Sequence, residues 1–77
     1  MKKISSLSKI YKNSLIKIGD ILINEYGFTE KVDFHIFNLV KLSTKKMINK
    51  RWVWINCGWF KISDLEKKEY KKIIYEI

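Results

Sequence analysis

An alternation of apolar and polar residues with a period of two, over residues 32–42, constrains the fold of this chain more than any other feature. Side chains on a β-strand point alternately to the two faces of a sheet, so this period predicts a half-buried strand. The even-numbered positions are apolar apart from Asn38, and we therefore expect the even face to point inward. The expected inward residues are Val32, Phe34, Ile36, Val40 and Leu42.

The neighbouring segments extend this strand into a sheet. A β-branched run precedes it, and a tryptophan-rich run that is apolar on both faces follows it. Glycine, serine and lysine clusters between these runs are typical of turns. In chain order, the predicted elements are a strand at 18–23, a turn at 26–29, a strand at 32–42, a turn at 43–46, a strand at 47–56, a break at 57–58, and a short strand or tight corner at 59–62.

Two further segments flank the predicted sheet. The run Ser-Asp-Leu-Glu at residues 63–66 fits a capping box and predicts a C-terminal helix over 63–75. Residues 1–17 have apolar side chains at helical spacing but are rich in serine, which leaves both an amphipathic helix and a basic arm open. We therefore predict one α+β domain over 1–77, with a small twisted antiparallel sheet or SH3-like barrel over 18–62.

Basic residues exceed acidic ones and are unevenly placed. Sixteen Lys and Arg against eight Asp and Glu give a net charge of +8. Residues 1–19 and 41–61 contain no acid, residues 20–40 are acidic, and residues 62–77 are balanced. Two basic zones flanking an acidic one make polyanions the first partner to consider. A composition rich in Lys and Ile would account for the basicity equally well without any such partner.

Cations bracket aromatic residues between Lys45 and Lys61. This pattern suits single-stranded nucleic acid, because cations hold phosphates while rings stack on bases. In a domain of 77 residues tryptophans also serve as core, so whether they are buried or form an exposed platform stays open. The candidate nucleic-acid or partner-binding residues are Lys45, Lys46, Lys50, Arg51, Trp52, Trp54 and Lys61, together with Lys9 and Lys12 of the N-terminal segment.

A second candidate surface has the opposite charge. Tyr26, Phe28 and Glu30 form an aromatic and acidic loop near Glu25 and Asp33. Such a surface repels phosphate and suits a protein partner.

Residue types that support enzymatic chemistry are scarce. His35 and Cys57 are the only His and Cys, which excludes a zinc cage of these residues from one chain. Asp33 lies two positions before His35 and is close enough for a hydrogen bond, but we interpret the pair as a surface feature and Cys57 as a small buried hydrophobe. The three glycines are isolated, so no phosphate-cradling loop is present. We expect no enzymatic activity, no cofactor, no metal and no small-molecule substrate.

Cysteine content and hydropathy indicate the cellular compartment. A single cysteine, Cys57, allows no internal disulfide and indicates a reducing compartment. Lysines interrupt each apolar run near the N-terminus, so we expect neither a signal peptide nor a membrane span. The sequence therefore predicts a cytoplasmic protein without a membrane partner.

Residues 18–45 resemble a family of short, mostly uncharacterised proteins of phages and mobile elements. The resemblance lies in Gly-Asp-Ile-Leu at 19–22, Tyr-Gly-Phe at 26–28 and Val-Asp-Phe at 32–34. It implies a small β-rich fold and a phage or mobile-element origin. Proteins of that origin commonly bind host machinery, and inhibitors of CRISPR or restriction systems are one class.

Two functional hypotheses follow from these patterns. The first is a non-enzymatic binder of nucleic acid or of a nucleoprotein complex, which uses the basic aromatic zone at 45–61. The alternative is a protein-binding inhibitor of a host defence enzyme, such as an anti-CRISPR or anti-restriction protein.

Overall fold

The structure is a computed structural model that describes residues 3–11 and 14–75. Six strands and one short helix make up the described part of the chain. In chain order they are β1 (Ile4–Lys9), β2 (Ile21–Ile23), β3 (Thr29–Ile36), β4 (Leu39–Ile48), β5 (Arg51–Lys61), α1 (Ile62–Lys67) and β6 (Lys71–Tyr75).

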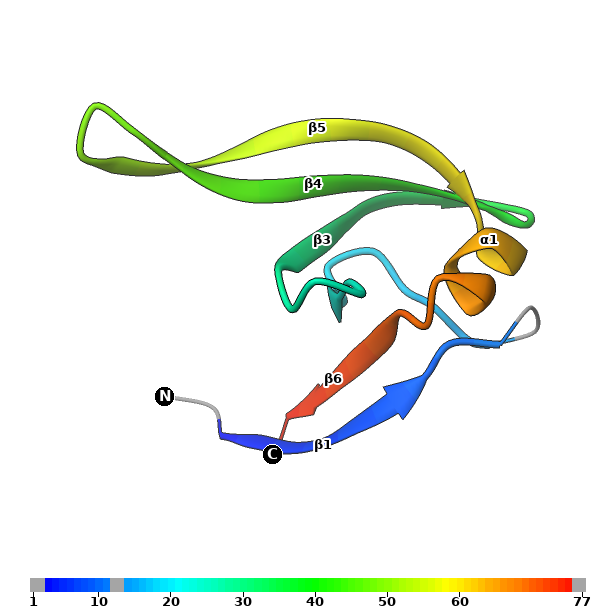
Figure 1. Cartoon of the computed structure of the whole chain (residues 1–77). Coiled ribbons are helices and arrows are strands. Elements are labelled where there is room, and N and C mark those ends of the chain that lie inside the picture. The colour runs from blue at the N-terminus through cyan, green and yellow to red at the C-terminus, as the bar shows by residue number, and fades with distance from the viewer. Residues whose placement is uncertain (1–2, 12–13, 76–77) are drawn as a thin grey trace.

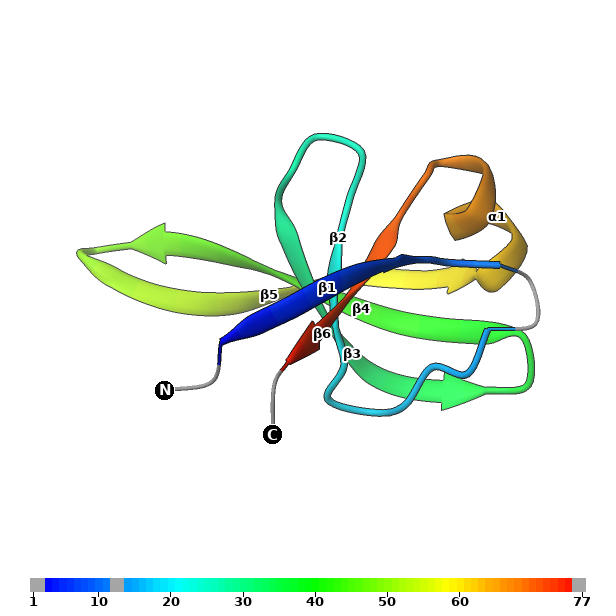
Figure 2. The same cartoon turned by 90° about the horizontal axis from the view of Figure 1, so that it is seen from below.

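All six strands belong to one antiparallel sheet with the order β1-β6-β2-β3-β4-β5. The sheet folds over on itself, so that β3, β4 and β5 form one layer and β1 and β6 cross beneath it (Figures 1 and 2). The predicted small antiparallel α+β class is confirmed. The predicted barrel is not formed, because β1 and β5 remain as two edges and the sheet does not close.

The core lies between these two layers, and α1 covers one end of it (Figure 1). Aliphatic side chains dominate it, and each one fully buried contributes roughly 1.5–3 kcal/mol. The buried residues of this cluster are Ile10, Ile16, Leu22, Val32, Val40, Leu42, Ile62, Leu65 and Tyr70, with Phe60 packed against them.

The predicted helix over 63–75 is wrong in length, because α1 ends at Lys67 and β6 follows. Glu69 has a left-handed backbone (φ 58°) and its N–H donates to the Glu66 carbonyl, while the Tyr70 N–H donates to the Leu65 carbonyl. These bonds form a Schellman motif, which ends a helix. The expected capping box is also absent, because the N-cap is Lys61 and its side chain makes no capping bond.

The N-terminal segment is neither the predicted helix nor a free arm. Its residues Ile4–Lys9 form β1, which pairs with β6 over most of its length, for example Leu7 with Ile73. Every described side chain of β1 is exposed, so the strand is held by backbone hydrogen bonds at the sheet edge.

The turns also differ from the predicted ones. The run at 32–42 is two strands, because the chain reverses at Phe37 and Asn38. Residues 43–46 lie inside β4, and the reversal comes at Asn49 and Lys50, which both have positive φ (51° and 62°). Two positive φ angles in a two-residue loop are typical of a type I′ hairpin turn.

Candidate nucleic-acid interface

All three tryptophans lie exposed on the face of β5 that points away from the core. Trp52, Trp54 and Trp59 expose 61%, 39% and 46% of their surface. Trp52 pairs with Met47 and Trp54 with Lys45 across the β4–β5 ladder, and directly paired residues point to the same face. Of the two alternatives left open by the sequence, the exposed platform is the one that the structure adopts.

A β-bulge in β5 brings Trp59 to the same face as the other two tryptophans. Residues 52 and 54 are even and 59 is odd, so a regular strand would place Trp59 on the inner face. The register shifts between Ser43, which pairs with Asn56, and Leu42, which pairs with Gly58, so Cys57 is the extra residue. The expected break at residues 57–58 is therefore this bulge, and β5 continues through it.

A second bulge, in β3, has the same effect on Phe34. The register shifts between Val32 and Phe34, so the side chain of Phe34 points outward instead of inward as the alternation predicted. Ile36 follows it to the outer face for the same reason, and both are about half exposed. Phe34, Lys41 and Trp59 thus form one row across three strands.

Lysines stand between the outward rings. The Nζ atom of Lys31 lies 4.8 Å from the centre of the Trp54 ring, and that of Lys45 lies 5.5 Å from Trp52. Lys41 lies 5.7 Å from Phe34. At these distances, cation–π attraction holds each ammonium group beside a ring that remains exposed. We call this surface the aromatic–lysine face; it comprises Phe34, Trp52, Trp54, Trp59, Lys31, Lys41 and Lys45.

One carboxylate, that of Asp33, lies at this surface. It accepts a hydrogen bond from the Ser43 hydroxyl, and Oδ1 lies 3.8 Å from Lys31 Nζ. The hydroxyl satisfies one carboxylate oxygen, and the ammonium group of Lys31 offsets the negative charge. The face therefore keeps its positive character despite this one acid.

The β4–β5 hairpin extends beyond the rest of the molecule (Figures 1 and 2). Residues 45–52 are all exposed, on both faces of the two-stranded ribbon. The predicted binding residues Lys45, Lys46, Lys50, Arg51 and Trp52 all belong to this hairpin, which places four cations around its tip. The structure thus brings together this part of the predicted site.

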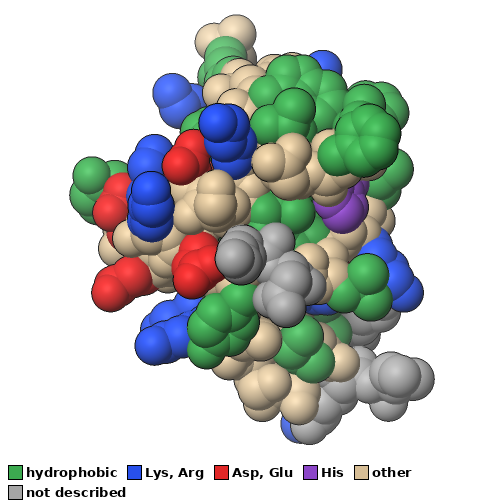
Figure 3. Space-filling view, turned by 90° about the vertical axis from the view of Figure 1, so that its right-hand side faces the viewer, with side chains coloured by type: hydrophobic (Ala, Val, Ile, Leu, Met, Phe, Trp, Pro, Cys, Tyr) green, Lys and Arg blue, Asp and Glu red, His purple; other side chains and the backbone are tan. Residues whose placement is uncertain are grey.

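The other end of the same layer is apolar. Phe37 is 94% exposed at the β3–β4 turn, beside the outward Ile36 and Phe34. Figure 3 shows hydrophobic side chains gathered next to the histidine at this end, with the acidic side chains on the opposite side of the view. Lys61 pairs with Leu39 in this region, away from the hairpin tip.

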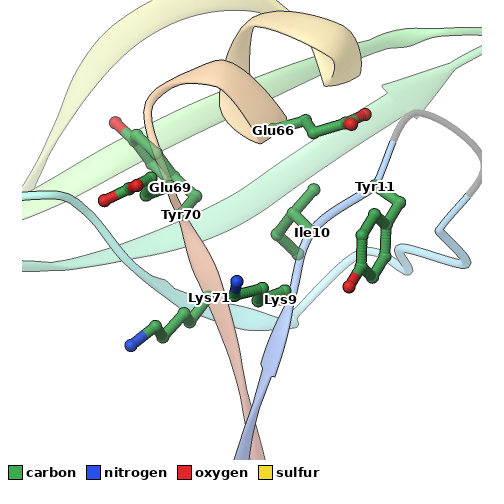
Figure 4. A pocket seen from close by; sticks show the side chains of 7 residues that line it. All are labelled: Lys9, Ile10, Tyr11, Glu66, Glu69, Tyr70 and Lys71. Atoms are coloured by element: carbon green, nitrogen blue, oxygen red, sulfur yellow. The ribbon is translucent and has the colours of Figure 1, made fainter.

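Lys9 does not join the predicted site. It lies on β1 in the lower layer, where it lines a pocket of about 460 Å³ between β1, α1 and β6 (Figure 4). Two lysines and two glutamates line this pocket, so its charges offset one another and it does not suit a polyanion. The lining residues are Lys9, Ile10, Tyr11, Glu66, Glu69, Tyr70 and Lys71. Lys12, also predicted for the site, lies outside the described residues.

The predicted protein-partner loop is exposed at its tip, over residues 25–28, but not at Glu30. Tyr26 and Phe28 expose 77% and 65% of their surface. The Asn24 side chain shapes the loop, because its Oδ1 accepts hydrogen bonds from the Tyr26 and Phe28 N–H groups at 2.9 and 3.0 Å. The loop therefore has a defined conformation although its tip lies in solvent.

Glu30 was expected on that loop, and this is wrong: it is buried on the inner face of β3. Its Oε2 accepts hydrogen bonds from the Tyr70 hydroxyl and from Asn24 Nδ2, both at 2.8 Å. Two donors satisfy the buried carboxylate, as its burial requires. Burial, and next the bond to Glu30, raise the pKa of the Tyr70 hydroxyl well above its ordinary value.

The residues considered for catalysis do not come together. Asp33 bonds Ser43, whereas the Nε2 atom of His35 lies 2.7 Å from the Phe37 carbonyl oxygen. Cys57 was expected to be buried but is exposed at the bulge, and partial desolvation, followed by the charge of Glu30, raises the pKa of its thiol. A raised pKa disfavours the nucleophilic thiolate.

Residues 3–11 and 14–75 hold neither a candidate metal site nor a candidate membrane-spanning helix. Those residues contain no group of three or more His, Cys, Asp or Glu placed to hold a metal ion. Within the same ranges, no helix has the length and apolar character to cross a membrane.

The sequence reasoning missed four members of the aromatic–lysine face. Lys31, Lys41 and Phe34 precede the basic aromatic zone in the sequence, and Trp59 lies within the zone but was not among the predicted site residues. Only the pairing of β3 and β5 with β4 places them together. Comparison of the chain with family models, curated proteins and solved structures gave no match.

Proposed function

We propose that the protein is a non-enzymatic binder of nucleic acid and that the aromatic–lysine face is its contact surface. The observation that supports this most strongly is the exposure of all three tryptophans on one sheet face with lysines beside them. Exposed aromatic patches of this kind on a small protein mark interaction sites. Nucleic acid offers both an anionic backbone for the lysines and a π face for the rings.

The charge distribution favours the same ligand. Residues 41–61, which make up most of β4 and all of β5, contain six cations and no acid. Lys45, Lys46, Lys50 and Arg51 surround the tip of the exposed hairpin, within reach of phosphates on either side of the ribbon. Each phosphate that they neutralise releases counterions, so the affinity falls as salt rises.

The test is a titration of fluorescently labelled DNA and RNA with the purified protein at several salt concentrations. The variant has the four hairpin cations changed to Gln, and the matched control has the exposed lysines Lys3, Lys17, Lys67 and Lys71 changed to Gln. We expect the hairpin variant to lower the slope of log K against log salt by up to about 3 for a single strand, and the control to stay closer to wild type. Equal loss in both variants, or no salt-dependent binding by wild type, would contradict the proposal.

A second candidate function is the binding of a host protein, as in an inhibitor of a phage-defence enzyme. The observation that favours it is the Tyr26–Phe28 loop, which exposes two aromatic rings on a conformation held by Asn24. Aromatic side chains of this kind are common anchors at protein interfaces. Changing Tyr26 and Phe28 to Ala should abolish stoichiometric recovery of a protein from nuclease-treated lysate, while equal recovery with both forms would argue against this role.

A further inference from the structure

We infer that the ligand of the aromatic–lysine face is a single strand, which lies along β5 with its bases stacked on the three tryptophans. This inference rests on the proposed function and narrows it to one class of nucleic acid. Duplexes and single strands expose different parts of their bases to a protein. A duplex keeps its bases stacked and shows only their edges in the grooves, whereas an unpaired strand can offer base faces to aromatic side chains.

The spacing of the rings fits this ligand. Trp52 and Trp54 are two residues apart on β5, and Trp54 and Trp59 are five apart with one residue taken up by the bulge. At about 3.3 Å per strand residue the three rings span about 20 Å. That length equals about six nucleotides at the stacked spacing of about 3.4 Å, and fewer when the strand is stretched. It lies at the low end of the roughly 4–16 nucleotides bound by one OB fold, another small β-domain.

The bulge determines how long this row of rings is. Gly58 has a φ of 100°, and its N–H donates to the Asn56 side-chain oxygen at 2.6 Å. A glycine adopts this backbone easily, while a residue with a Cβ does not. Without the bulge Trp59 would point inward, and two rings instead of three would remain outward on β5.

The lysines lie on one side of the row. Lys45 and Lys41 are on β4, directly beside Trp54 and Trp59, whereas the other side of β5 is an open sheet edge. The backbone of a bound strand is therefore placed over β4, where the ammonium groups meet its phosphates. Lys31, above Trp54, extends this positive side onto β3.

The test measures binding of labelled oligothymidylates of about 2 to 12 nucleotides, and of duplexes of matched length, by fluorescence anisotropy. The variants are Trp54→Ala, Trp59→Ala and Trp59→Phe. Tyr11→Ala is the matched control, because it removes an exposed ring that follows β1, at the other end of the sheet order from β5. Circular dichroism spectra verify that each variant is folded.

We expect affinity to rise with length up to about six nucleotides and then to level off. Trp59→Ala should lower the affinity for an eight-mer roughly 5- to 100-fold and leave that for a three-mer nearly unchanged, since the other two rings still bind it. Trp54→Ala should weaken both, Trp59→Phe should restore most of the eight-mer affinity, and Tyr11→Ala should change nothing.

Equal or tighter binding of duplex, or eight-mer affinity that ignores Trp59→Ala, would overturn this inference. Either result would leave the proposed function standing, because salt-dependent binding of nucleic acid would still be observed. The proposed function itself fails if wild type shows no salt-dependent binding of nucleic acid, or if the hairpin variant and its control lose affinity equally.

Discussion

The two faces of the β3–β4–β5 layer differ in the size of their side chains, and the larger side chains lie on the exposed face. The inner face is covered by aliphatic residues such as Val32, Val40 and Leu42, which are fully buried. The outer face carries the largest side chains, the three tryptophans, in solvent. Burial of large aromatic rings is the strongest source of stability for a small domain. Their place outside indicates that the inner face holds the fold together and the outer face is available for a partner.

The largest effect on stability should come from the inner face. Leu42→Ala removes a fully buried side chain from the layer that faces α1 and the lower strands. We expect the free energy of unfolding to fall by about 2–5 kcal/mol, because a cavity remains where the side chain was. Urea unfolding followed by circular dichroism measures this change. A loss below about 1 kcal/mol would mean that the inner face is not the main source of stability.

The buried polar network should be the next most sensitive part of the inner face. Tyr70→Phe removes one of the two donors to the buried Glu30 carboxylate, and we expect a loss of about 1–3 kcal/mol in unfolding free energy. The pKa of Tyr70 is raised in the folded protein, so its contribution is present below the ordinary tyrosine value of 10.0 and is lost as the pH rises above it. Wild type should therefore lose stability between about pH 9 and 11 more steeply than Tyr70→Phe. Parallel pH profiles of the two proteins would contradict this assignment.

The β5 bulge moves Trp59 from the inner face to the outer face, and substitution of its glycine should have an intermediate effect on stability. Gly58→Ala meets no atom within 4 Å but requires a φ of 100°, so we expect it to cost about 1–2 kcal/mol through backbone strain alone. Urea unfolding gives the stability change, with Cys57→Ser as a control that keeps the bulge glycine. If Gly58→Ala were as stable as wild type, the bulge would not depend on glycine.

The smallest effect on stability should come from the outer face. Trp52→Ala truncates the most exposed tryptophan, and we expect the free energy of unfolding to change by no more than about 0.5 kcal/mol. The same urea experiment measures it beside Leu42→Ala. A loss comparable to that of Leu42→Ala would remove the distinction between the two faces.

Local patterns predicted strands within residues 18–62, but they missed β1, β6 and the features that depend on distant contacts. The tryptophan-rich strand and the strand before the Tyr26 loop were recognisable from their β-branched and aromatic residues. The residues of β6 were predicted to be helical because the end of α1 could not be recognised from the sequence. The left-handed residue that ends this helix is Glu69, whereas Gly or Asn usually occupies such a position. The Tyr70 hydroxyl donates a hydrogen bond to Glu30, forty positions earlier, and no local sequence pattern indicates such a bond.

The candidate site was predicted in part for the same reason. The hairpin cations with Trp52 and Trp54 are neighbours in sequence, so their grouping was visible. Phe34 and Trp59 reach the outer face only because a bulge in β3 and another in β5 shift the alternation by one residue. An isolated period of two cannot indicate where such a shift occurs.

We expect nucleic acid to bind the outer face of the β3–β4–β5 layer through the three tryptophans of that face. Each indole N–H gives its own resonance in a ¹H–¹⁵N NMR spectrum, so the three tryptophans report separately on a titration with a single-stranded oligonucleotide. We expect all three indole signals to shift together on binding, while the backbone amide of Leu7, on β1 at the other end of the sheet order, stays in place. Indole signals that do not move, with shifts elsewhere or none at all, would contradict it.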